Sequence, residues 1–382
     1  MQTKGALLWG ANEEWSVESI DIPDPLPPEV TVKLSACGIC HTDEHLVTGD
    51  LPVSHYPMLG GHEAAGEIVA LGGAVSGYAV GDRVVLSAIP SCGHCRPCML
   101  GYGAVCDLAY RTLSGESIAD NTRRIRARGQ EVAPLCHIGG LAPYVTVHEY
   151  SLVKIEKEIP LDLAALLGCG VSTGWGAVVN VAEVKPGDTA VVMGLGGVGA
   201  SASLACAASG AERVVVIDPV ETKRDHAMAL GATHFYSSLD EAREGLSEET
   251  WGQMADKVLI TVGRMEASLL QDAIDLTGKF GVVVPISAGN FKANDVSLNL
   301  DGLRGYLRSI KGVIQNGGNP KLEITKLIGL YASGKLPLEN LVTARYCLDD
   351  VNLGFQHMRE GRNIRGLVTF DHDGGPAAAR PS

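Results

Sequence analysis

The first part of the chain alternates short apolar, β-branched runs with turns rich in glycine, proline and aspartate. The runs are ALLWG, EVTVKLSACG, GEIVALG, GDRVVLSAI and APYVTVHEYSLVKI, and DIPDPLPPE forms a rigid connection between two of them. Short β-branched runs bounded by such residues are typical of strands. The pattern therefore predicts a β-rich module over residues 4–150.

From about residue 171 the pattern changes to alternating strands and helices. Apolar strands are predicted at TAVVMG, RVVVID, DKVLITVG and FGVVVPIS, and helices at residues 197–210, ETKRDHAMALGA and MEASLLQDAIDLTG. Repeated βαβ units with apolar strands predict a parallel sheet covered by helices on both faces. Near residue 315 the alternation stops, and two amphipathic helices, KLEITKLIGLYASG and DDVNLGFQHMREG, precede a last strand, RGLVTF.

The length and net charge of the chain limit the number of domains and the kinds of partner to be expected. A chain of 382 residues exceeds the size that one core usually supports, so two domains are expected. A net charge of −13 disfavours nucleic acid as a partner. Only the segment Arg123 to Arg128, RRIRAR, is locally basic, and a solvated loop is favoured there over a phosphate site. The uncharged stretch 189–211 has five glycines, so a strand, a tight turn and a buried helix explain it better than a membrane span.

The N-terminal sequence MQTKGALLWGANEEW has no apolar core of a signal peptide, so a cytoplasmic location is expected. Thiols stay reduced in that compartment, and ten cysteines there favour metal binding over disulfides. Four of them, Cys92, Cys95, Cys98 and Cys106, lie within SCGHCRPCMLGYGAVC. Four thiolates can close a tetrahedral site with no open position, which predicts a structural zinc.

A second candidate metal site is dispersed along the chain. CGICHTDEH, GGHEAAGE and LLGCGVSTGWG contribute Cys40, His62 and Cys169. Two cysteines and one histidine form a ligand set that a catalytic zinc uses, with one position open. The residues alone leave other interpretations open. Taken singly, Cys169 resembles an ordinary buried thiol, and His62 could be a histidine that serves a turn. Cys37 is an alternative to Cys40 as the metal ligand.

The glycine-rich segment GLGGVG, residues 194–199, follows a predicted strand and opens a predicted helix, and a second strand ends in Asp218. Gly194 suits a tight turn, Gly196 a close approach to a pyrophosphate, and Gly199 close packing of helix on strand. Asp218 can accept hydrogen bonds from a ribose 2′-hydroxyl and would repel a 2′-phosphate, which favours NAD over NADP. Lys223 can touch the same ribose. Flavin adenine dinucleotide and a purely structural glycine turn are the alternatives.

Together these motifs resemble the zinc-dependent medium-chain alcohol dehydrogenases over nearly the whole chain. The matching stretches are CGICHTDEH, GGHEAAG, the four-cysteine loop, GCGVSTGWG, GLGGVG with VVVIDP, and NIRGLVTF. ADNTRRIRARGQ, VNVAEVKPGDT and DPVETKRDHAMALGATH are similar to the members that use a nitroso-dimethylaniline dye (NDMA) as an artificial acceptor. Those members tend to hold NAD(H) without releasing it.

The resemblance implies an α/β fold with a discontinuous, GroES-like, β-rich catalytic domain and a Rossmann domain with a doubly wound parallel sheet. It places the catalytic domain at residues 1–170 and 315–370, the NAD-binding domain at 171–314, and a disordered tail at 371–382. It also implies a homo-oligomer. The dimer and the tetramer both stay open, because IQNGGNP, near the expected subunit interface, departs from the pattern.

The resemblance further implies hydride transfer between a primary alcohol, aliphatic or aromatic, or its aldehyde, and NAD. Two zinc ions per chain, tightly held NAD(H) and an external electron acceptor belong to this expectation. The catalytic zinc would lower the pKa of the alcohol hydroxyl. Thr42 would pass the released proton through the nicotinamide ribose to His45 near solvent.

The resemblance assigns the remaining roles residue by residue. Cys40, His62 and Cys169 would bind the catalytic zinc, with Glu63 beside it and Asp43 orienting His62. His41 and Arg365 would meet the pyrophosphate, and Thr173 the nicotinamide. The whole implied cofactor-binding set is His41, Thr173, Gly194, Gly196, Gly197, Val198, Gly199, Asp218, Lys223 and Arg365. Leu51 and Ala88 are guesses for the lining of the substrate pocket.

Two alternative functions stay open. A glutathione-dependent formaldehyde dehydrogenase would share the zinc residues but needs an anion-binding pocket, which Arg111 or the Arg123–Arg128 segment could supply. A non-catalytic nucleotide-binding sensor would keep the fold and lose the chemistry, because a fold does not fix a function. Such a protein would retain only the ion in the four-cysteine loop.

Overall fold

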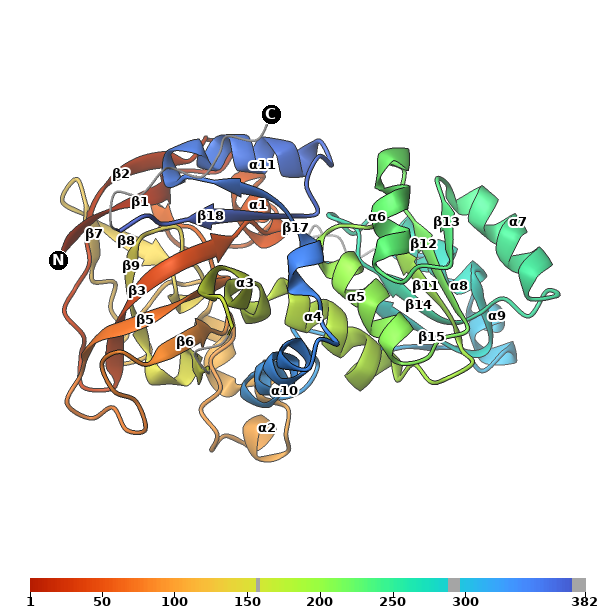
Figure 1. Ribbon diagram of the computed structural model, residues 1–382, viewed down its shortest axis with the longest axis horizontal. Coiled ribbons are helices and arrows are strands. Elements are labelled where there is room, and N and C mark those ends of the chain that lie inside the picture. The colour runs from red at the N-terminus through yellow and green to blue at the C-terminus, as the bar shows by residue number, and fades with distance from the viewer. Residues whose placement is uncertain (156–158, 288–295, 373–382) are drawn as a thin grey trace. The chain divides into compact units, whose positions relative to one another are not determined.

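The computed structural model describes residues 1–155, 159–287 and 296–372. The chain forms two compact units (Figure 1). The first holds Met1–Gly170 and the chain from Gly318 onward, and the second holds Val171–Gly317. The sequence places these limits at 170/171 and 314/315. Most of the predicted disordered tail, from residue 373 onward, lies outside the described residues.

The first unit contains a closed barrel and a seven-stranded sheet. The barrel runs in the order β1 (Gln2–Leu8), β2 (Ser16–Asp21), β7 (Ile125–Ala127), β8 (Gln130–Pro134), β4 (Met58–Leu59). The sheet runs in the order β10 (Leu152–Lys154), β6 (Arg83–Leu86), β5 (Ala64–Leu71), β3 (Glu29–Gly38), β18 (Arg365–Thr369), β17 (Val342–Tyr346), and β9 (Tyr144–His148) also pairs with β3. This is the predicted β-rich module. Along its strands, apolar side chains that point to one face of the sheet are buried.

The end of the chain returns to this sheet. Strand β18 pairs antiparallel with β3, with Leu367 opposite Gly38 and Val368 opposite Cys37. In Figure 1 the dark blue β18 accordingly runs beside the red-orange β3. The first unit is therefore discontinuous in sequence.

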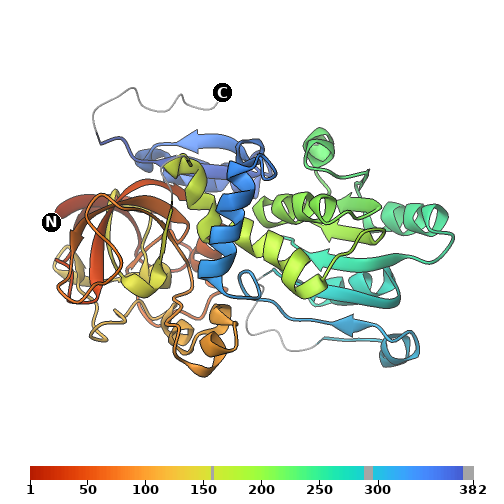
Figure 2. The same ribbon diagram turned by 60° about the horizontal axis from the view of Figure 1, so that its bottom comes forward.

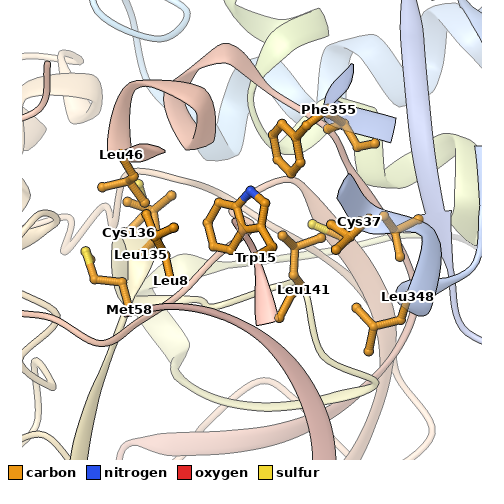
Figure 3. Close-up of a cluster of buried hydrophobic side chains, with 14 of the residues drawn as sticks. Leu8, Trp15, Cys37, Leu46, Met58, Leu135, Cys136, Leu141, Leu348 and Phe355 are labelled. Carbon is orange, nitrogen blue, oxygen red and sulfur yellow. The ribbon is translucent and has the colours of Figure 1, made fainter. Parts of the chain in front are cut away.

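One apolar cluster in this unit is built around Trp15 (Figure 3). The Trp15 ring stacks on Phe355, with ring centroids 5.5 Å apart. Leu46 and Cys37 are buried in the same cluster, and Leu46 lies on α1 (His41–Val47). Burying a leucine side chain contributes about 1.5–3 kcal/mol. This core therefore helps to hold α1, which carries Thr42 and His45, against the barrel and the sheet.

The second unit is a six-stranded parallel sheet. Its order is β13 (His234–Tyr236), β12 (Arg213–Ile217), β11 (Thr189–Met193), β14 (Ala255–Ile260), β15 (Thr277–Pro285), β16 (Ser309–Ile310), and every neighbouring pair is parallel. Helices lie on both faces (Figures 1 and 2). The order reverses beside β11, which is the switch point of a dinucleotide-binding fold. The predicted fold class is confirmed.

The helices follow the predicted pattern with local differences. They are α2 (Arg96–Met99), α3 (Leu161–Ala165), α4 (Gly170–Gly176), α5 (Gly197–Ala208), α6 (Arg224–Ala229), α7 (Leu239–Glu249), α8 (Ser268–Asp275), α9 (Leu300–Gly305), α10 (Pro320–Ala332) and α11 (Val351–Arg359). The segment ETKRDHAMALGA begins as a 3₁₀ turn and becomes α-helical only at Arg224. Helix α7 was not predicted from the sequence, although Ser238 caps it by accepting a hydrogen bond from the Glu241 N–H, a recognisable start signal.

The uncharged stretch 189–211 forms β11, a turn and α5, as predicted. Within the described parts of the chain, no single helix has both the length and the apolar character needed to cross a membrane. One bent pair, Leu161–Gly168 with Gly170–Ala182, meets those two criteria together.

Candidate metal centres and dinucleotide site

Three distant segments of the first unit bring four possible ligand side chains together. Their ligand atoms, from Cys40, His62, Glu63 and Cys169, all lie within 4.8 Å of one another. Cys40 is the residue before α1. His62 and Glu63 directly precede β5, and Cys169 directly precedes α4. The backbone N–H of Gly38 donates to the Glu63 carbonyl (2.8 Å), which fixes the end of β3 to the strand that bears the histidine.

The buried thiols and the imidazole of this cluster shift one another's pKa values. A hydrogen bond from the Cys169 thiol lowers the pKa of Cys40 well below its usual range, against the effect of burial. The same hydrogen bond, together with burial, raises the pKa of Cys169. Burial alone would lower the pKa of His62, but the charges of Asp43 and Cys40 outweigh it and raise that pKa. Zinc takes thiolate and neutral imidazole, so its binding would release these protons.

The orientation of His62 is set by Asp43. The Asp43 Oδ2 lies 3.1 Å from Nδ1 of His62, and both side chains are buried. The Gly61 N–H donates to the other carboxylate oxygen (2.6 Å). Neither ring nitrogen of His62 makes a hydrogen bond of standard geometry in the described part of the chain, so the close contact with Asp43 orients the ring electrostatically and leaves Nε2 available to a metal ion. The donor set therefore fits zinc.

Glu63 is held between two groups. One carboxylate oxygen accepts from the Gly170 N–H (3.0 Å), and the other pairs with the buried Arg365 guanidinium from β18. A Cβ on Gly38 would lie 2.2 Å from the Glu63 carboxylate, so this close approach requires glycine. The structure thus places Arg365, expected at a pyrophosphate, against the carboxylate beside the candidate metal ligands.

The four cysteines of the loop 91–106 also converge. The Sγ atoms of Cys92, Cys95, Cys98 and Cys106 all lie within 4.8 Å of one another. Cys92 and Cys98 are 3.9 Å apart and Cys95 and Cys106 3.8 Å, and all four are free thiols, so no disulfide joins them. This is a closed, all-sulfur tetrahedral donor set.

Backbone N–H groups prepare that loop for a cation. Burial raises the pKa of Cys95, but N–H donors from Asp107 and Cys98 outweigh it and bring the pKa to about 7. Burial raises the pKa of Cys106 to about 12. The Ala104 N–H donates to the Gly318 carbonyl (2.8 Å), which fastens the loop to the segment before α10.

The glycine-rich turn has the geometry of a phosphate-binding loop. Gly194 follows β11 with φ +99°, and Gly196 precedes the first turn of α5, which Gly197 and Val198 begin. A Cβ on Gly199 would lie 1.9 Å from the Gly194 carbonyl oxygen, whereas the space around Gly196 is open to 4 Å. Gly194 therefore makes the tight turn, Gly196 leaves room for a ligand to approach the backbone, and Gly199 allows the helix to pack closely on the strand, as the motif requires.

Asp218 stands at the end of β12 and is buried. Its Oδ2 accepts from the Leu195 N–H (2.7 Å) and from Nζ of Lys223 (2.9 Å), and its Oδ1 accepts from the Val220 N–H (2.9 Å). The carboxylate thus fixes the glycine loop to the end of β12.

The comparisons with known proteins point to one family. Residues 26–157 match the family described as "Alcohol dehydrogenase GroES-like domain", and residues 197–333 match "Zinc-binding dehydrogenase". "Alcohol dehydrogenase B" of Mycobacterium tuberculosis is 45% identical over 98% of this chain and its own full length.

The chain belongs to the zinc-dependent medium-chain alcohol dehydrogenases.

The resemblance to the dye-dependent members is confirmed as well. The "NDMA-dependent alcohol dehydrogenase" of Amycolatopsis methanolica is 40% identical over 98% of this chain and 100% of its own. Among solved structures, benzyl alcohol dehydrogenase from Acinetobacter calcoaceticus superposes with a TM-score of 0.89 at 30% identity, covering 97% of this chain and 100% of that one. This chain is thus an alcohol dehydrogenase rather than a non-catalytic sensor.

In this dehydrogenase the expected relay residues lie on α1. The Cys40 Sγ lies 3.7 Å from the half-buried Thr42 hydroxyl, and His45 follows one turn later on the same helix face. His41, at the first position of α1, is half-buried. His45 was expected near solvent, but its side chain is only 4% exposed. The turn after α1 folds back over the helix and covers it, which periodicity alone does not reveal.

The competing cysteine and the guessed pocket residues are also placed. Cys37 lies in the apolar core around Trp15, its thiol donates to the Gly38 carbonyl (3.6 Å), and it is not part of either cysteine cluster. Leu51 and Ala88 are buried in that same core, against which Cys169 packs. Thr173 lies on α4 in the second unit and is buried.

The basic segment is neutralised by carboxylates. Arg123 pairs with Glu116 (3.5 Å), Arg126 with Glu131 (3.1 Å) and Arg128 with Glu18 (2.6 Å), and Arg124 pairs with the buried Glu29. Arg111 donates to the Tyr110 hydroxyl (2.5 Å). Because its guanidinium groups already face carboxylates, the Arg123–Arg128 segment is a poor pocket for the glutathione of the alternative enzyme.

Proposed function

We propose that this alcohol dehydrogenase transfers hydride between a primary alcohol, aliphatic or aromatic, and NAD, with Cys40, His62 and Cys169 holding the catalytic zinc. The observation that carries the proposal is the convergence of two thiols and an imidazole within 4.8 Å, with the imidazole already oriented by a buried carboxylate. The solved relative that acts on benzyl alcohol supports an aromatic substrate, at 30% identity.

A bound zinc supplies a Lewis acid that lowers the pKa of an alcohol hydroxyl. The chain does the rest. Asp43 keeps the Nε2 of His62 turned toward the metal ligands. With the alcohol and cofactor bound, Thr42 would accept the hydroxyl proton, and His45, on the same face of α1, would be its final acceptor. The buried Arg365 guanidinium holds the Glu63 carboxylate in place beside the site.

NAD is proposed as the cofactor over NADP. The Asp218 carboxylate at the end of β12 accepts three hydrogen bonds, including one from Lys223. A 2′-phosphate beside this carboxylate would bring two anions together, whereas a ribose 2′-hydroxyl could donate a hydrogen bond to it.

We further propose that the chain keeps NAD(H) bound and passes electrons to an external acceptor, as the name of the Amycolatopsis relative suggests for that protein. After extensive dialysis, the protein should oxidise benzyl alcohol with NDMA and no added NAD. Denaturing it should release about one nucleotide per chain. The absorbance of the dye measures the oxidation of the alcohol, and chromatography measures the nucleotide that is released.

The matched variant for this test is Gly199→Ala. Its Cβ would meet the Gly194 carbonyl oxygen at 1.9 Å, so the loop must shift and the nucleotide content should fall. Gly329→Ala, in α10 with no atom within 4 Å of the added Cβ, should retain the nucleotide. Dialysed wild-type protein that turns over only with added NAD would contradict tight retention. Formaldehyde oxidation that requires glutathione would favour the alternative enzyme instead.

A homo-oligomer, dimer or tetramer, is proposed from the edge of the parallel sheet. Strand β16 ends the sheet order, and Phe280, Tyr306 and Leu307 near it are 73%, 46% and 65% exposed. An apolar sheet edge of this kind favours pairing with another chain. Light scattering coupled to size-exclusion chromatography should give the molar mass of a dimer or of a larger oligomer. Leu307→Glu should lower this mass toward that of the monomer. A monomeric wild-type protein would contradict the proposal.

A further inference from the structure

The turn that follows α1 brings a carboxylate onto His45. The Thr48 N–H donates to the Glu44 carbonyl (2.9 Å), Gly49 takes φ +72°, and the Leu51 N–H returns to the His45 carbonyl (3.1 Å). Glycine is favoured at such a left-handed helix end. The reversal places Oδ2 of Asp50 at 3.3 Å from Nδ1 of His45.

The Asp50 carboxylate is itself held in place. The Thr48 hydroxyl donates to the same Oδ2 atom (2.9 Å). The side chain of Asp50 is 11% exposed and that of His45 only 4%. A contact that is largely shielded from water is stronger than an exposed one.

The other acidic groups of α1 face elsewhere. Asp43 contacts His62, and Glu44 accepts from Arg359 of α11 (2.9 Å). The second ring nitrogen of His45, Nε2, is buried and makes no hydrogen bond within the described residues. The imidazole therefore has a carboxylate at one nitrogen and an uncommitted lone pair or proton at the other.

We propose that Asp50 is a positioning residue that holds His45 in the Nδ1–H tautomer, so that Nε2 is the proton acceptor. This inference rests on the proposed role of His45 at the end of the relay. A carboxylate only accepts hydrogen bonds, so the neutral imidazole must place its single proton on Nδ1. Nε2 then carries the lone pair that can receive the proton.

The proton balance is simple. One proton leaves the alcohol hydroxyl and reaches Nε2. This forms an imidazolium whose Nδ1–H still donates a hydrogen bond to the Asp50 carboxylate. The carboxylate stabilises that cation without taking the proton, and Nε2 later gives the proton to water. Without Asp50 the ring is free to rotate or to adopt the other tautomer, with its proton on the wrong nitrogen.

The kinetic test compares Asp50→Ala with Asp50→Asn in the holoenzyme, by rapid mixing with benzyl alcohol and observation of the nicotinamide absorbance. Asp50→Ala should slow reduction of the bound nucleotide by about tenfold, because a general base contributes about 10²–10⁴-fold and the imidazole itself remains. Its alcohol KM should change little. Asp50→Asn, whose amide oxygen can still accept from Nδ1–H, should recover most of the rate. Asp349→Ala, an exposed partner of Lys4, is the control.

A double variant separates positioning from a general loss of structure. Asp50→Ala in a His45→Gln background should slow the reaction no further, since the group it positions is already gone. Additive losses would overturn the proposal, as would an Asp50→Ala enzyme with the wild-type rate.

Nitrogen NMR of histidine-labelled protein provides a readout that does not depend on activity. The His45 ring, identified by its loss in His45→Gln, should show the Nδ1–H tautomer in the wild type and in Asp50→Asn, and a mixture in Asp50→Ala. An unchanged tautomer in Asp50→Ala would refute the inference, while alcohol oxidation by the wild type would still support the proposed function. A wild type without alcohol oxidation would instead refute the proposed function.

Discussion

Cys169→Ser is expected to abolish most alcohol oxidation while the fold survives. The variant removes one of the two sulfur donors, Cys40 and Cys169, whose ligand atoms lie within 4.8 Å of each other and of His62. A catalytic metal contributes several kcal/mol to the transition state, so turnover with NDMA should fall by about 10³-fold or more. The metal content should fall by one ion per chain, as measured by elemental analysis, with the circular dichroism spectrum unchanged.

The control for this variant is Cys347→Ser. Cys347 lies outside both cysteine clusters and donates to Asp350 (3.0 Å), a contact that a serine hydroxyl can also make. This variant should keep both the metal content and the rate. Near-normal turnover by a Cys169→Ser protein that has lost the metal ion would overturn the assignment of the catalytic centre.

Cys98→Ser should have its main effect on stability. Cys98 is buried, and its Sγ lies 3.9 Å from that of Cys92 and 3.6 Å from the Ser91 hydroxyl. The loop around it exposes Met99, Leu100 and Tyr102, so it has little apolar core of its own, and a bound metal ion is expected to hold it together. The free energy of unfolding should fall by about 3 kcal/mol or more, and proteases should cut within residues 91–111.

Met99→Ser is the matched control within the same loop, because Met99 is 70% exposed and provides no ligand. It should unfold at the wild-type temperature and resist cleavage. At low temperature, Cys98→Ser should still contain its nucleotide, since the glycine loop belongs to the other unit. A Cys98→Ser protein with wild-type stability and one fewer metal ion would show that this loop does not need its ion.

Much of the fold is visible in the sequence because its signals are local. The strand–glycine–helix transition at residues 189–208 follows from an apolar run, a turn that needs a positive φ at Gly194, and small residues that allow close packing. The four-cysteine loop is likewise local, because all its donors lie within fifteen residues. The helix α7 had a local signal too, the Ser238 cap, but its few apolar positions hid it.

The dispersed centre is a different case. Cys40, His62 and Cys169 are each unremarkable in their own segments, and a resemblance to a family, not spacing, joined them. The structure excludes Cys37 because strand alternation on β3 sends its side chain into the apolar core around Trp15, whereas Cys40 follows the strand and caps α1. Only the pairing of strands and the return of the chain at β18 bring the segments and Arg365 together.

By itself, the sequence determined the β-rich and βαβ halves, the glycine loop and the four-cysteine loop, because each depends on residues close together in the chain. The tertiary structure alone decided that Arg365 faces Glu63 and that Asp50 covers a buried His45. These are contacts between side chains whose burial and direction are set by packing of distant elements. Periodicity and spacing carry no record of such packing, so no local pattern could have predicted them.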